Sequence, residues 1–326
     1  KPRLTSRLFA FIMLNSTFCK LAKDMEVCYN YAQYLIKGHT MSNILSLQSH
    51  VAYGYVGNRA AVFPLQRLGN EVVVINTVQF SNHTGYGDWT GDIMSIEHID
   101  NIFYGLEKRG VFNKLDAVLT GYLGDSQLGD VLIKWLGIIK LNNPKLIYCC
   151  DPVIGDVGRG VFVKPGVPEF FLNQTLNCAN ILTPNQFELE YLTGINIQIL
   201  SDALEACAIL HNKGVEIILL TSLECNDYIS AGTIGMLVST STIKYLIKTP
   251  KIQMPIAPNG SGDMTAALFL AKYLETKDLQ LTLEFVAAAV YSIFQETLTL
   301  QQRELAIIAA QEQFINPNYT FKAIKL

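Results

Sequence analysis

From residue 43 onward, short continuous apolar runs alternate with longer segments of helical periodicity. Apolar runs separated by helices are typical of a parallel sheet whose strands are buried on both faces. The predicted strands are Ile44–Gln48, Val72–Val78, Ala117–Thr120, Leu146–Cys150, Ile181–Thr183 and Glu216–Thr221. The predicted helices between them cover residues 58–68, 97–109, 126–141, 186–193 and 201–213.

This alternation changes after residue 226. The segment 227–248 (DYISAGTIGMLVSTSTIKYLIK) predicts two or three strands joined by short turns, which would form an antiparallel edge of the sheet. Three more helices are predicted at 263–275, 281–295 and 301–313. Because no repeat or long linker interrupts residues 41–326, we expect one α/β domain there, with a central, mostly parallel sheet between two layers of helices.

Residues 1–40 differ from the rest of the chain. They contain six Lys or Arg residues against Asp24 and Glu26, and they show no clear hydrophobic period. A basic start with a short apolar core can indicate a targeting peptide, but no small-residue cleavage site follows the apolar run Leu8–Leu14. We therefore interpret this segment as an extension upstream of a natural start at Met41, or as a peripheral piece of the protein.

Composition and charge exclude several classes of function. The net charge of −3 leaves no basic footprint for nucleic acid and no polybasic patch for a membrane. The run Leu8–Leu14 is too short to span a bilayer. The seven cysteines are odd in number and include no C-x-x-C pair, so neither a disulfide framework nor a structural zinc site is expected. A cytoplasmic protein is the resulting prediction.

Polar residues follow the carboxyl ends of the predicted strands. Ser49 and His50 follow the first strand, QFSNHTGYGDW the second, GYLGD the third, Asp151 the fourth and TPNQFE the fifth. In open α/β sheets, ligands bind outside these strand ends. The polar content is thus concentrated where a site is expected.

The segment 258–271 (PNGSGDMTAALFLA) contains a Gly-x-Gly-Asp sequence that leads directly into an apolar, helix-like run. Residues 260–266 resemble the dinucleotide pattern G-x-G-x-x-A, although Ala266 lies one residue beyond the position that the pattern requires, and the pattern has meaning only directly after a strand. Pro255 and Pro258 argue against a strand there, and the charge of Asp263 would repel a bound pyrophosphate. No Gly-Lys dipeptide exists for a Walker A loop. Dinucleotide binding and P-loop chemistry are therefore disfavoured.

The same segment has the parts of an anion-binding loop. Gly260 and Gly262 let backbone N–H groups converge, Ser261 lies between them, and the following helix adds donors and the positive end of its dipole. Asp263 at the N-cap of that helix could accept a proton from an attacking hydroxyl during phosphoryl transfer. Asp is also a favoured N-cap, so spacing alone leaves Asp263 either a helix cap or a general base.

At this point the chain resembles the ribokinase superfamily of small-molecule kinases, and within it the pyridoxal kinases of the PdxY type. The resemblance runs from about Met41 to Leu326. It is carried by NILSLQSHVAYGYVGNRAAVFPLQRLG (43–69), NTVQFSNHTGYGDWTG (76–91), VLTGYLGD (118–125), CDPVIGD (150–156), TPNQFELEYLTG (183–194) and NGSGD (259–263). The string QFSNHTGYG is the narrowest of these, since it is not general to the superfamily.

The resemblance implies a ribokinase-like fold and transfer of the γ-phosphoryl group of ATP to the 5′-hydroxymethyl group of pyridoxal. Asp263 then matches the catalytic base. Ser49 matches the residue that hydrogen-bonds the pyridine ring, and Thr84 and Gly85 match a pair in contact with substrate. Many relatives carry a polar amide at the position of Gly85. Tyr122 lies where an aromatic residue could contact the ring or shape its pocket.

On the nucleotide side, the resemblance assigns Asp151, Thr183 and Glu188 to ATP. Asp151 and Glu188 are also implied to organise Mg²⁺, partly through water, with Glu188 closing an Asn185-x-x-Glu motif. Mg²⁺ prefers one or two carboxylates plus water and phosphate oxygens. The plainer interpretations are a helix-capping Asp151 and a surface Glu188.

Residues 155–160 (GDVGRG) can be interpreted either as a flexible lid over the phosphates of ATP or as a plain surface loop. The remaining implied ATP-binding residues are Thr221, where relatives often carry Lys, and Lys248, Thr249, Pro250 and Lys251 in a loop lining the adenine side.

Two rival functions stay open at this stage, and the resemblance also implies a homodimer. Hydroxymethylpyrimidine kinase shares the Gly-x-Gly-Asp loop and the phosphorylation of an alcohol, but SNHTGYG favours pyridoxal. A protein that carries pyridoxal phosphate with negligible turnover would fit the altered positions Gly85 and Thr221. Asp263 argues against a carrier, because an anionic base beside a phosphate adds nothing to binding.

Overall fold

The computed structural model describes residues 41–326, so the interpretation of residues 1–40 lies outside the described residues. All six predicted parallel strands are present, with small differences at their ends. They are β1 (Asn43–Val51), β2 (Glu71–Phe80), β4 (Ala117–Thr120), β5 (Ile147–Cys150), β8 (Ile181–Leu182) and β9 (Ile217–Leu223). The antiparallel strands at the two edges are β3 (Gly91–Ile93), β10 (Thr233–Ser239), β11 (Lys244–Pro250) and β12 (Ile324–Lys325).

The ten strands lie in the order β12-β11-β10-β9-β8-β5-β4-β1-β2-β3. Pairing is parallel from β9 through to β2, and antiparallel beyond β9 and between β2 and β3. The antiparallel edge expected in residues 227–248 is therefore confirmed as the β10–β11 hairpin, in which Thr233 pairs with Pro250 and Ser239 with Lys244. A separate two-stranded hairpin is formed by β6 (Gly155–Asp156) and β7 (Gly160–Val161).

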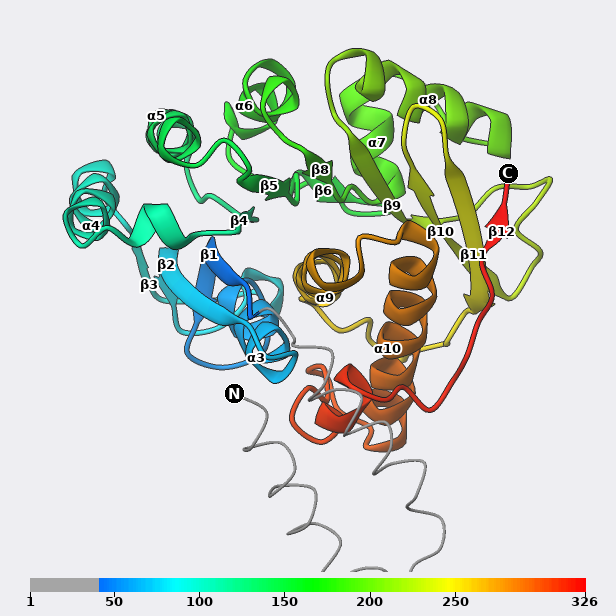
Figure 1. Cartoon of the computed structure of the whole chain (residues 1–326). Coiled ribbons are helices and arrows are strands. Elements are labelled where there is room, and N and C mark those ends of the chain that lie inside the picture. Colours follow the sequence, from blue (N-terminus) through cyan, green and yellow to red (C-terminus); the bar gives the residue numbers. More distant parts are fainter. Residues whose placement is uncertain (1–40) are drawn as a thin grey trace, which may run out of the picture. The chain divides into compact units, whose positions relative to one another are not determined.

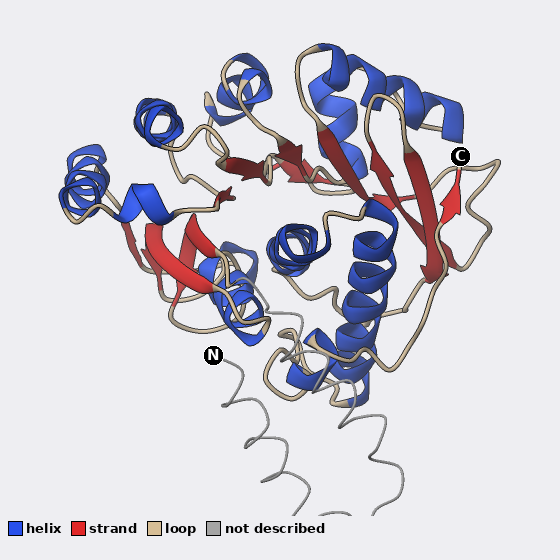
Figure 2. Cartoon of the chain, viewed as in Figure 1, coloured by secondary structure: helices blue, strands red, loops and turns tan. Residues whose placement is uncertain are grey.

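Helices cover both faces of the sheet (Figures 1 and 2). One layer contains α3 (Asn58–Arg67), α9 (Ser261–Thr276) and α10 (Leu279–Thr299). The other contains α4 (Ile96–Lys108), α5 (Gln127–Asn142), α6 (Val167–Asn173), α7 (Gln186–Thr193) and α8 (Leu200–Asn212). Short 3₁₀ turns complete the connections: η1 (Thr84–Tyr86), η2 (Val111–Lys114), η3 (Thr175–Asn177) and η4 (Gln311–Phe314).

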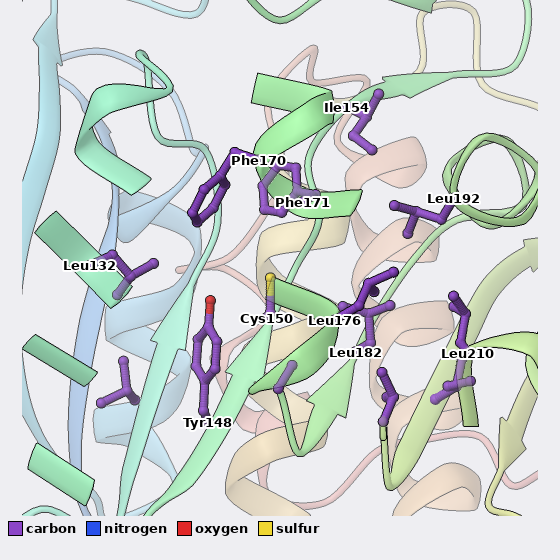
Figure 3. Close-up of a cluster of buried hydrophobic side chains, with 14 of the residues drawn as sticks. Leu132, Tyr148, Cys150, Ile154, Phe170, Phe171, Leu176, Leu182, Leu192 and Leu210 are labelled. Carbon is purple, nitrogen blue, oxygen red and sulfur yellow. The ribbon is translucent and has the colours of Figure 1, made fainter. Parts of the chain in front are cut away.

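Each helical layer encloses its own apolar core, and the strands contribute to both. Side chains alternate across a strand. Leu45 of β1 therefore packs under α4–α8, whereas its neighbour Ile44 packs under α3, α9 and α10. The same alternation places Cys150 in the first core and Cys149 in the second, which confirms that both are core residues. Figure 3 shows the first core, with Cys150 among Tyr148, Phe170, Phe171 and Leu182.

The predicted helix at 301–313 is wrong, and α6 was not predicted. Residues 301–310 form turns, followed only by η4. Gln301 adopts a left-handed conformation (φ +52°), which ends α10 and redirects the chain. Leu305 and Ile307 are then buried in the second core, and residues 301–310 contain a single helix-type hydrogen bond, from the Ala310 N–H to the Ala306 carbonyl at 2.8 Å. None of the helices in residues 41–326 combines the length and apolar character needed to cross a lipid bilayer.

Candidate active site

The carboxyl ends of β1, β4, β5 and β8 meet at one edge of the sheet because these strands are parallel neighbours. Three buried polar atoms at or next to these ends have no hydrogen-bond partner among the described residues: Gln48 Oε1, His50 Nδ1 and Thr183 Oγ1. Buried polar groups are normally paired. Their concentration at one edge indicates that a polar ligand or water completes this part of the structure.

Asp263 lies at this edge, in the first turn of α9. The helix begins at Ser261 with Gly260 as N-cap, so the expectation that Asp263 caps the helix is wrong by three positions. Its Oδ2 atom accepts a hydrogen bond from the Gly57 N–H at 2.8 Å. Its Oδ1 atom faces Gly121, where it lies 3.4 Å from the position a Cβ would occupy. Burial raises the pKa of Asp263, while the Gly57 N–H opposes that rise.

Gly260 allows the anion-binding loop to approach the segment after β1. Its φ of +82° is left-handed, and a Cβ there would overlap the carbonyl oxygen of Tyr55. Only glycine adopts this conformation and this approach without strain. Because Ser261 and Gly262 lie in the first turn of α9, their N–H groups have no partner within the helix. The loop therefore presents free backbone donors beside the Asp263 carboxylate.

Gly57 links two of the predicted residues, a role that sequence reasoning missed. Its φ is +54°, and a Cβ there would overlap both the carbonyl oxygen and the hydroxyl of Ser49. Gly57 thus packs directly on Ser49 while donating to Asp263. The Gly54-x-x-Gly57 spacing was visible in the sequence. This spacing did not indicate the role of Gly57, because its hydrogen-bond partner Asp263 is 206 residues away in the sequence.

A buried hydrogen-bond network orients Gln48 behind these residues. Asn58 Nδ2 donates to the Ile75 carbonyl and to Asn76 Oδ1, so Asn58 Oδ1 accepts from the Ser46 hydroxyl at 2.7 Å. The Ser46 oxygen then accepts from Gln48 Nε2 at 3.0 Å. This leaves Gln48 Oε1 as a free acceptor, 2.6 Å from the position of a Cβ on Gly121. Gln48 and Asp263 therefore approach Gly121 together.

Thr84 and Gly85 lie in the exposed turn η1, which other parts of the chain hold in place. His83 Nδ1 caps this turn by accepting from the Gly85 N–H at 3.0 Å. Arg303 donates to the Gly85 carbonyl at 3.1 Å and lies over the Tyr86 ring, 3.6 Å from its centroid. The region 301–310, which was expected to be helical, instead supports this turn.

Glu304 provides the second support. Its carboxylate accepts from the Tyr86 hydroxyl at 2.6 Å and from the Tyr55 N–H at 2.8 Å. A Cβ on Gly54 would crowd the same carboxylate, at 2.5 Å from Oε2. The contact ties η1 to the segment after β1 that also carries Gly57. Sequence reasoning could not find Glu304 because nothing local marks its partners, 218 and 249 residues away.

Tyr122 follows β4 and is partly buried against Val51, Val56, Val78 and Phe80 at the carboxyl ends of β1 and β2. The Thr77 hydroxyl donates to the Tyr122 carbonyl at 2.7 Å, which anchors its backbone. Burial raises the pKa of the Tyr122 hydroxyl. The phenol stays protonated at neutral pH beside an apolar wall.

Asp151 and Glu188 are both buried, which contradicts the interpretation of Glu188 as a surface residue. Asp151 follows β5 without capping any helix, since residues 151–154 are irregular. Its Oδ2 lies 3.7 Å from the position of a Cβ on Gly262 and so borders the anion-binding loop. Burial, followed by the charges of Glu188 and Asp263, raises the pKa of Asp151 well above its usual range. Burial also raises the pKa of Glu188.

The Asn185-x-x-Glu motif is a reciprocal helix cap at the start of α7. Asn185 Oδ1 accepts from the Glu188 N–H at 2.8 Å, and Glu188 Oε2 accepts from the Asn185 N–H at 2.9 Å. Glu188 Oε1 accepts from the Ile154 N–H at 3.0 Å. The carboxylate is thus held between α7 and the irregular segment that begins with Asp151.

These acidic groups fit a magnesium ion as it is usually bound in nucleotide enzymes. Within residues 41–326 no group of three or more His, Cys, Asp or Glu side chains forms a metal-binding cluster. Mg²⁺ needs only one or two carboxylates when water and phosphate supply the other ligands. The raised pKa of buried Asp151 shows that its charge is poorly compensated by its present neighbours. A divalent cation would compensate it.

The remaining predicted nucleotide residues lie on the neighbouring strands. Thr183 directly follows β8, and the Thr221 N–H on β9 donates to the Pro184 carbonyl at 2.9 Å. Lys248, Thr249 and Pro250 do not form the expected loop, because they are the last residues of β11; only Lys251 lies beyond it. Residues 155–160 form the β6–β7 hairpin.

Comparison with known proteins gives a consistent set of relatives. Residues 171–300 match the model of the pfkB family carbohydrate kinases. The chain is 46% identical over 279 residues to "Pyridoxal kinase PdxY" of Rubrobacter xylanophilus, a match that covers 86% of this chain and 96% of the relative. It is 47% identical to the protein of the same name from Granulibacter bethesdensis, over 86% of this chain and 99% of the relative.

Solved structures show the same likeness in three dimensions. The pyridoxal kinase of Leishmania donovani in complex with ADP and ginkgotoxin superposes with a TM-score of 0.82 at 30% identity, covering 87% of this chain and 99% of that one. The pyridoxal kinase of Entamoeba histolytica superposes with a TM-score of 0.80 at 26% identity, covering 88% of this chain and 100% of that one.

Proposed function

Because the chain belongs to the pyridoxal kinase family of the PdxY type, with its PfkB ribokinase-like fold, we propose that it transfers the γ-phosphoryl group of ATP to the 5′-hydroxymethyl group of pyridoxal. The observation that carries the proposal is the placement of Asp263. Its partly buried carboxylate is held by the Gly57 N–H, beside free backbone donors at the start of α9. This arrangement supplies a proton acceptor and an anion-binding loop at one point.

The reaction follows from these groups. The 5′-hydroxyl gives its proton to Oδ1 of Asp263, the carboxylate oxygen that the Gly57 N–H leaves free. The hydroxyl oxygen forms a bond to the γ-phosphorus as the bond between that phosphorus and the β,γ-bridging oxygen breaks. The electron pair of that bond leaves with ADP. Because burial raises the pKa of Asp263, its carboxylate is a better proton acceptor than an exposed one.

The helix N-terminus stabilises the charge of the phosphoryl group in transfer. The N–H groups of Ser261 and Gly262, which follow Gly260, would donate hydrogen bonds to its oxygens. Preorganised backbone donors need no rearrangement during the reaction. Mg²⁺, held by Asp151 and Glu188 partly through water, would supply further neutralisation of the ATP phosphates when bound.

The proposed substrate residues are Ser49, which Gly57 holds beside Asp263, together with Thr84, Gly85 and Tyr122. We assign ATP to residues on or directly after strands β5, β8, β9 and β11, together with Glu188 of α7. They are Asp151, Thr183, Glu188, Thr221, Lys248, Thr249, Pro250 and Lys251.

The experiment that tests the function is a turnover assay with ATP and Mg²⁺, run separately with pyridoxal, pyridoxine, pyridoxamine and hydroxymethylpyrimidine. We expect phosphorylation of pyridoxal. Preference for hydroxymethylpyrimidine would assign the rival kinase function. No turnover, combined with tight binding of pyridoxal phosphate, would assign the carrier function.

Asp263→Asn tests the base. The amide keeps the size of the side chain but cannot take the proton, so we expect kcat to fall about 100- to 10,000-fold while pyridoxal still binds. Steady-state kinetics and equilibrium binding of pyridoxal measure the two effects. Unchanged kcat in this variant would remove Asp263 from the role of base.

A cytoplasmic location and a homodimeric state stay predictions. The described cysteines Cys149, Cys150, Cys178, Cys207 and Cys225 are all free thiols, which suits a reducing compartment.

A further inference from the structure

Arg159 projects from the β6–β7 hairpin toward both functional loops. Its Nη2 lies 3.6 Å from the position of a Cβ on Gly85, in the turn that carries the proposed substrate residues. Its Nη1 donates to Asn259 Oδ1 at 3.4 Å, directly before the Gly-x-Gly-Asp loop. The guanidinium therefore lies between the substrate turn and the anion-binding loop.

The hairpin holds Arg159 in this orientation. The Arg159 N–H donates to the Asp156 carbonyl at 3.1 Å, and the guanidinium lies over the Phe162 ring, 5.1 Å from its centroid. The hairpin itself packs closely on α7, because a Cβ on Gly155 would overlap Phe187. The positive charge is thus carried on a supported element, although the side chain is exposed.

The guanidinium has most of its hydrogen-bonding capacity left. Arginine has five N–H donors in a planar fork, suited to phosphate oxygens. Among residues 41–326, no carboxylate lies within ion-pair distance of Arg159, and the contact with Asn259 is a long one. Its charge also acts on this site, since the pKa of His83 is lowered first by burial and next by Arg159.

Gly85 leaves room for this arrangement. A Cβ at this position would crowd His83 Nδ1, at 2.7 Å, and a longer side chain would extend toward Arg159. With glycine there, the guanidinium can move above the turn without a competing side chain. Gly85 therefore leaves the space beside the Arg159 guanidinium free of a side chain.

We propose that Arg159 binds the phosphoryl group on the acceptor side of the reaction, and then the 5′-phosphate of the product. The inference rests on the proposed function for the identity of that product. Arg159 is assigned as a phosphate-binding residue that the backbone donors of Ser261 and Gly262 complement from the opposite loop. The dianionic product should depend on Arg159 far more than the uncharged hydroxymethyl substrate does.

The test compares binding of pyridoxal 5′-phosphate and of pyridoxal to Arg159→Gln, Arg159→Lys and the full wild-type chain. We expect Arg159→Gln to weaken pyridoxal 5′-phosphate binding about 10- to 100-fold, the range for a charge-assisted hydrogen bond, and pyridoxal binding less than about threefold. Arg159→Lys should recover part of the loss because it keeps the charge but not the fork. Raising the ionic strength should reduce the difference between wild type and Arg159→Gln.

Val157→Ala is the matched control, because Val157 is exposed on the same hairpin. It should bind both ligands as the wild type does. Equal binding of pyridoxal 5′-phosphate by wild type and Arg159→Gln would overturn the proposal, as would equal losses for both ligands. A failure of the proposed function would be distinguished from these outcomes by the turnover assay, because the wild-type chain would then not phosphorylate pyridoxal at all.

Discussion

At the scale of single residues, the site depends on glycines that allow chain segments to meet. Gly57 contacts Ser49 and donates to Asp263, while Gly260 lies against the Tyr55 carbonyl. Both have positive φ, and both approach backbone where a Cβ would overlap. These glycines therefore set the distance between the segment after β1 and the anion-binding loop.

Gly260→Ala should lower both stability and turnover. The variant combines left-handed strain with overlap on Tyr55, so we expect the free energy of unfolding to fall by about 2–4 kcal/mol. Gly232→Ala is the control, because Gly232 has nearly the same φ, +81°, but nothing within 4 Å of the added Cβ. It should cost about 1 kcal/mol and leave kcat unchanged. Urea denaturation and steady-state kinetics measure both; equal losses of stability in the two variants would contradict the role of the Tyr55 contact.

At the scale of elements, the segment after α10 shows how tertiary contacts override local propensity. Residues 301–313 have a helical composition, yet residues 301–310 form turns and only the short 3₁₀ helix η4 follows. A helix would direct Arg303 and Glu304 by its own periodicity, whereas the turns let both reach Tyr86 and its neighbours. Burial of Leu305 and Ile307 in the second core supports the irregular path.

Glu304→Ala should disturb substrate binding from outside the reacting groups. Loss of the bonds to Tyr86 and to the Tyr55 N–H frees η1, so we expect KM for pyridoxal to rise about tenfold with a smaller change in kcat. Glu304→Gln, which keeps an acceptor, should recover part of the effect. Glu312→Ala is the control, because it removes only an exposed ion pair with Arg67, worth less than about 1 kcal/mol. An unchanged KM in Glu304→Ala would refute the positioning role.

At the scale of the whole molecule, two sets of groups make stability depend on pH in opposite directions: the raised pKa of Asp151, Glu188 and Asp263 favours the folded chain as the solution is acidified, whereas the three histidines with lowered pKa disfavour it. Burial lowers the pKa of His50, His83 and His211. As pH falls through the ordinary value of about 6.5, these histidines take up protons in the unfolded chain before they do so in the folded one. The histidine contribution to the free energy of unfolding therefore decreases, and its loss is complete only below the lowered folded-state pKa values.

His211→Gln should reduce this dependence on pH. The His211 ring connects the end of α8 to β10, with Nδ1 2.7 Å from the Val215 carbonyl and Nε2 2.9 Å from the Ser239 hydroxyl. Because the variant lacks one group that takes up a proton preferentially in the unfolded chain, we expect its free energy of unfolding at about pH 5.5, relative to its own value at about pH 7.5, to be higher than that of the wild type. His98→Gln is the control, since His98 is exposed on α4, and its slope should match the wild type. If the free energy of unfolding of His211→Gln depended on pH as that of the wild type does, His211 would not contribute to this dependence.

The α/β class, the six parallel strands, the antiparallel edge and the stretches that carry the resemblance could all be predicted from the amino-acid sequence. These are encoded locally, because apolar runs and helical periods reflect burial on one or two faces. The polar residues after strand ends were also found in this way, since parallel strands end at the same edge.

The contacts between those residues, in contrast, depend on the tertiary structure. Whether Asp263 is a cap or sits deeper in the first turn depends on where α9 begins, and its partner Gly57 comes from the opposite end of the chain. The support of η1 by Glu304, the burial of Glu188 and the approach of Arg159 to Gly85 are likewise contacts between distant segments. Local propensity carries no information on such contacts, because their free energy appears only when the packed layers bring the segments together.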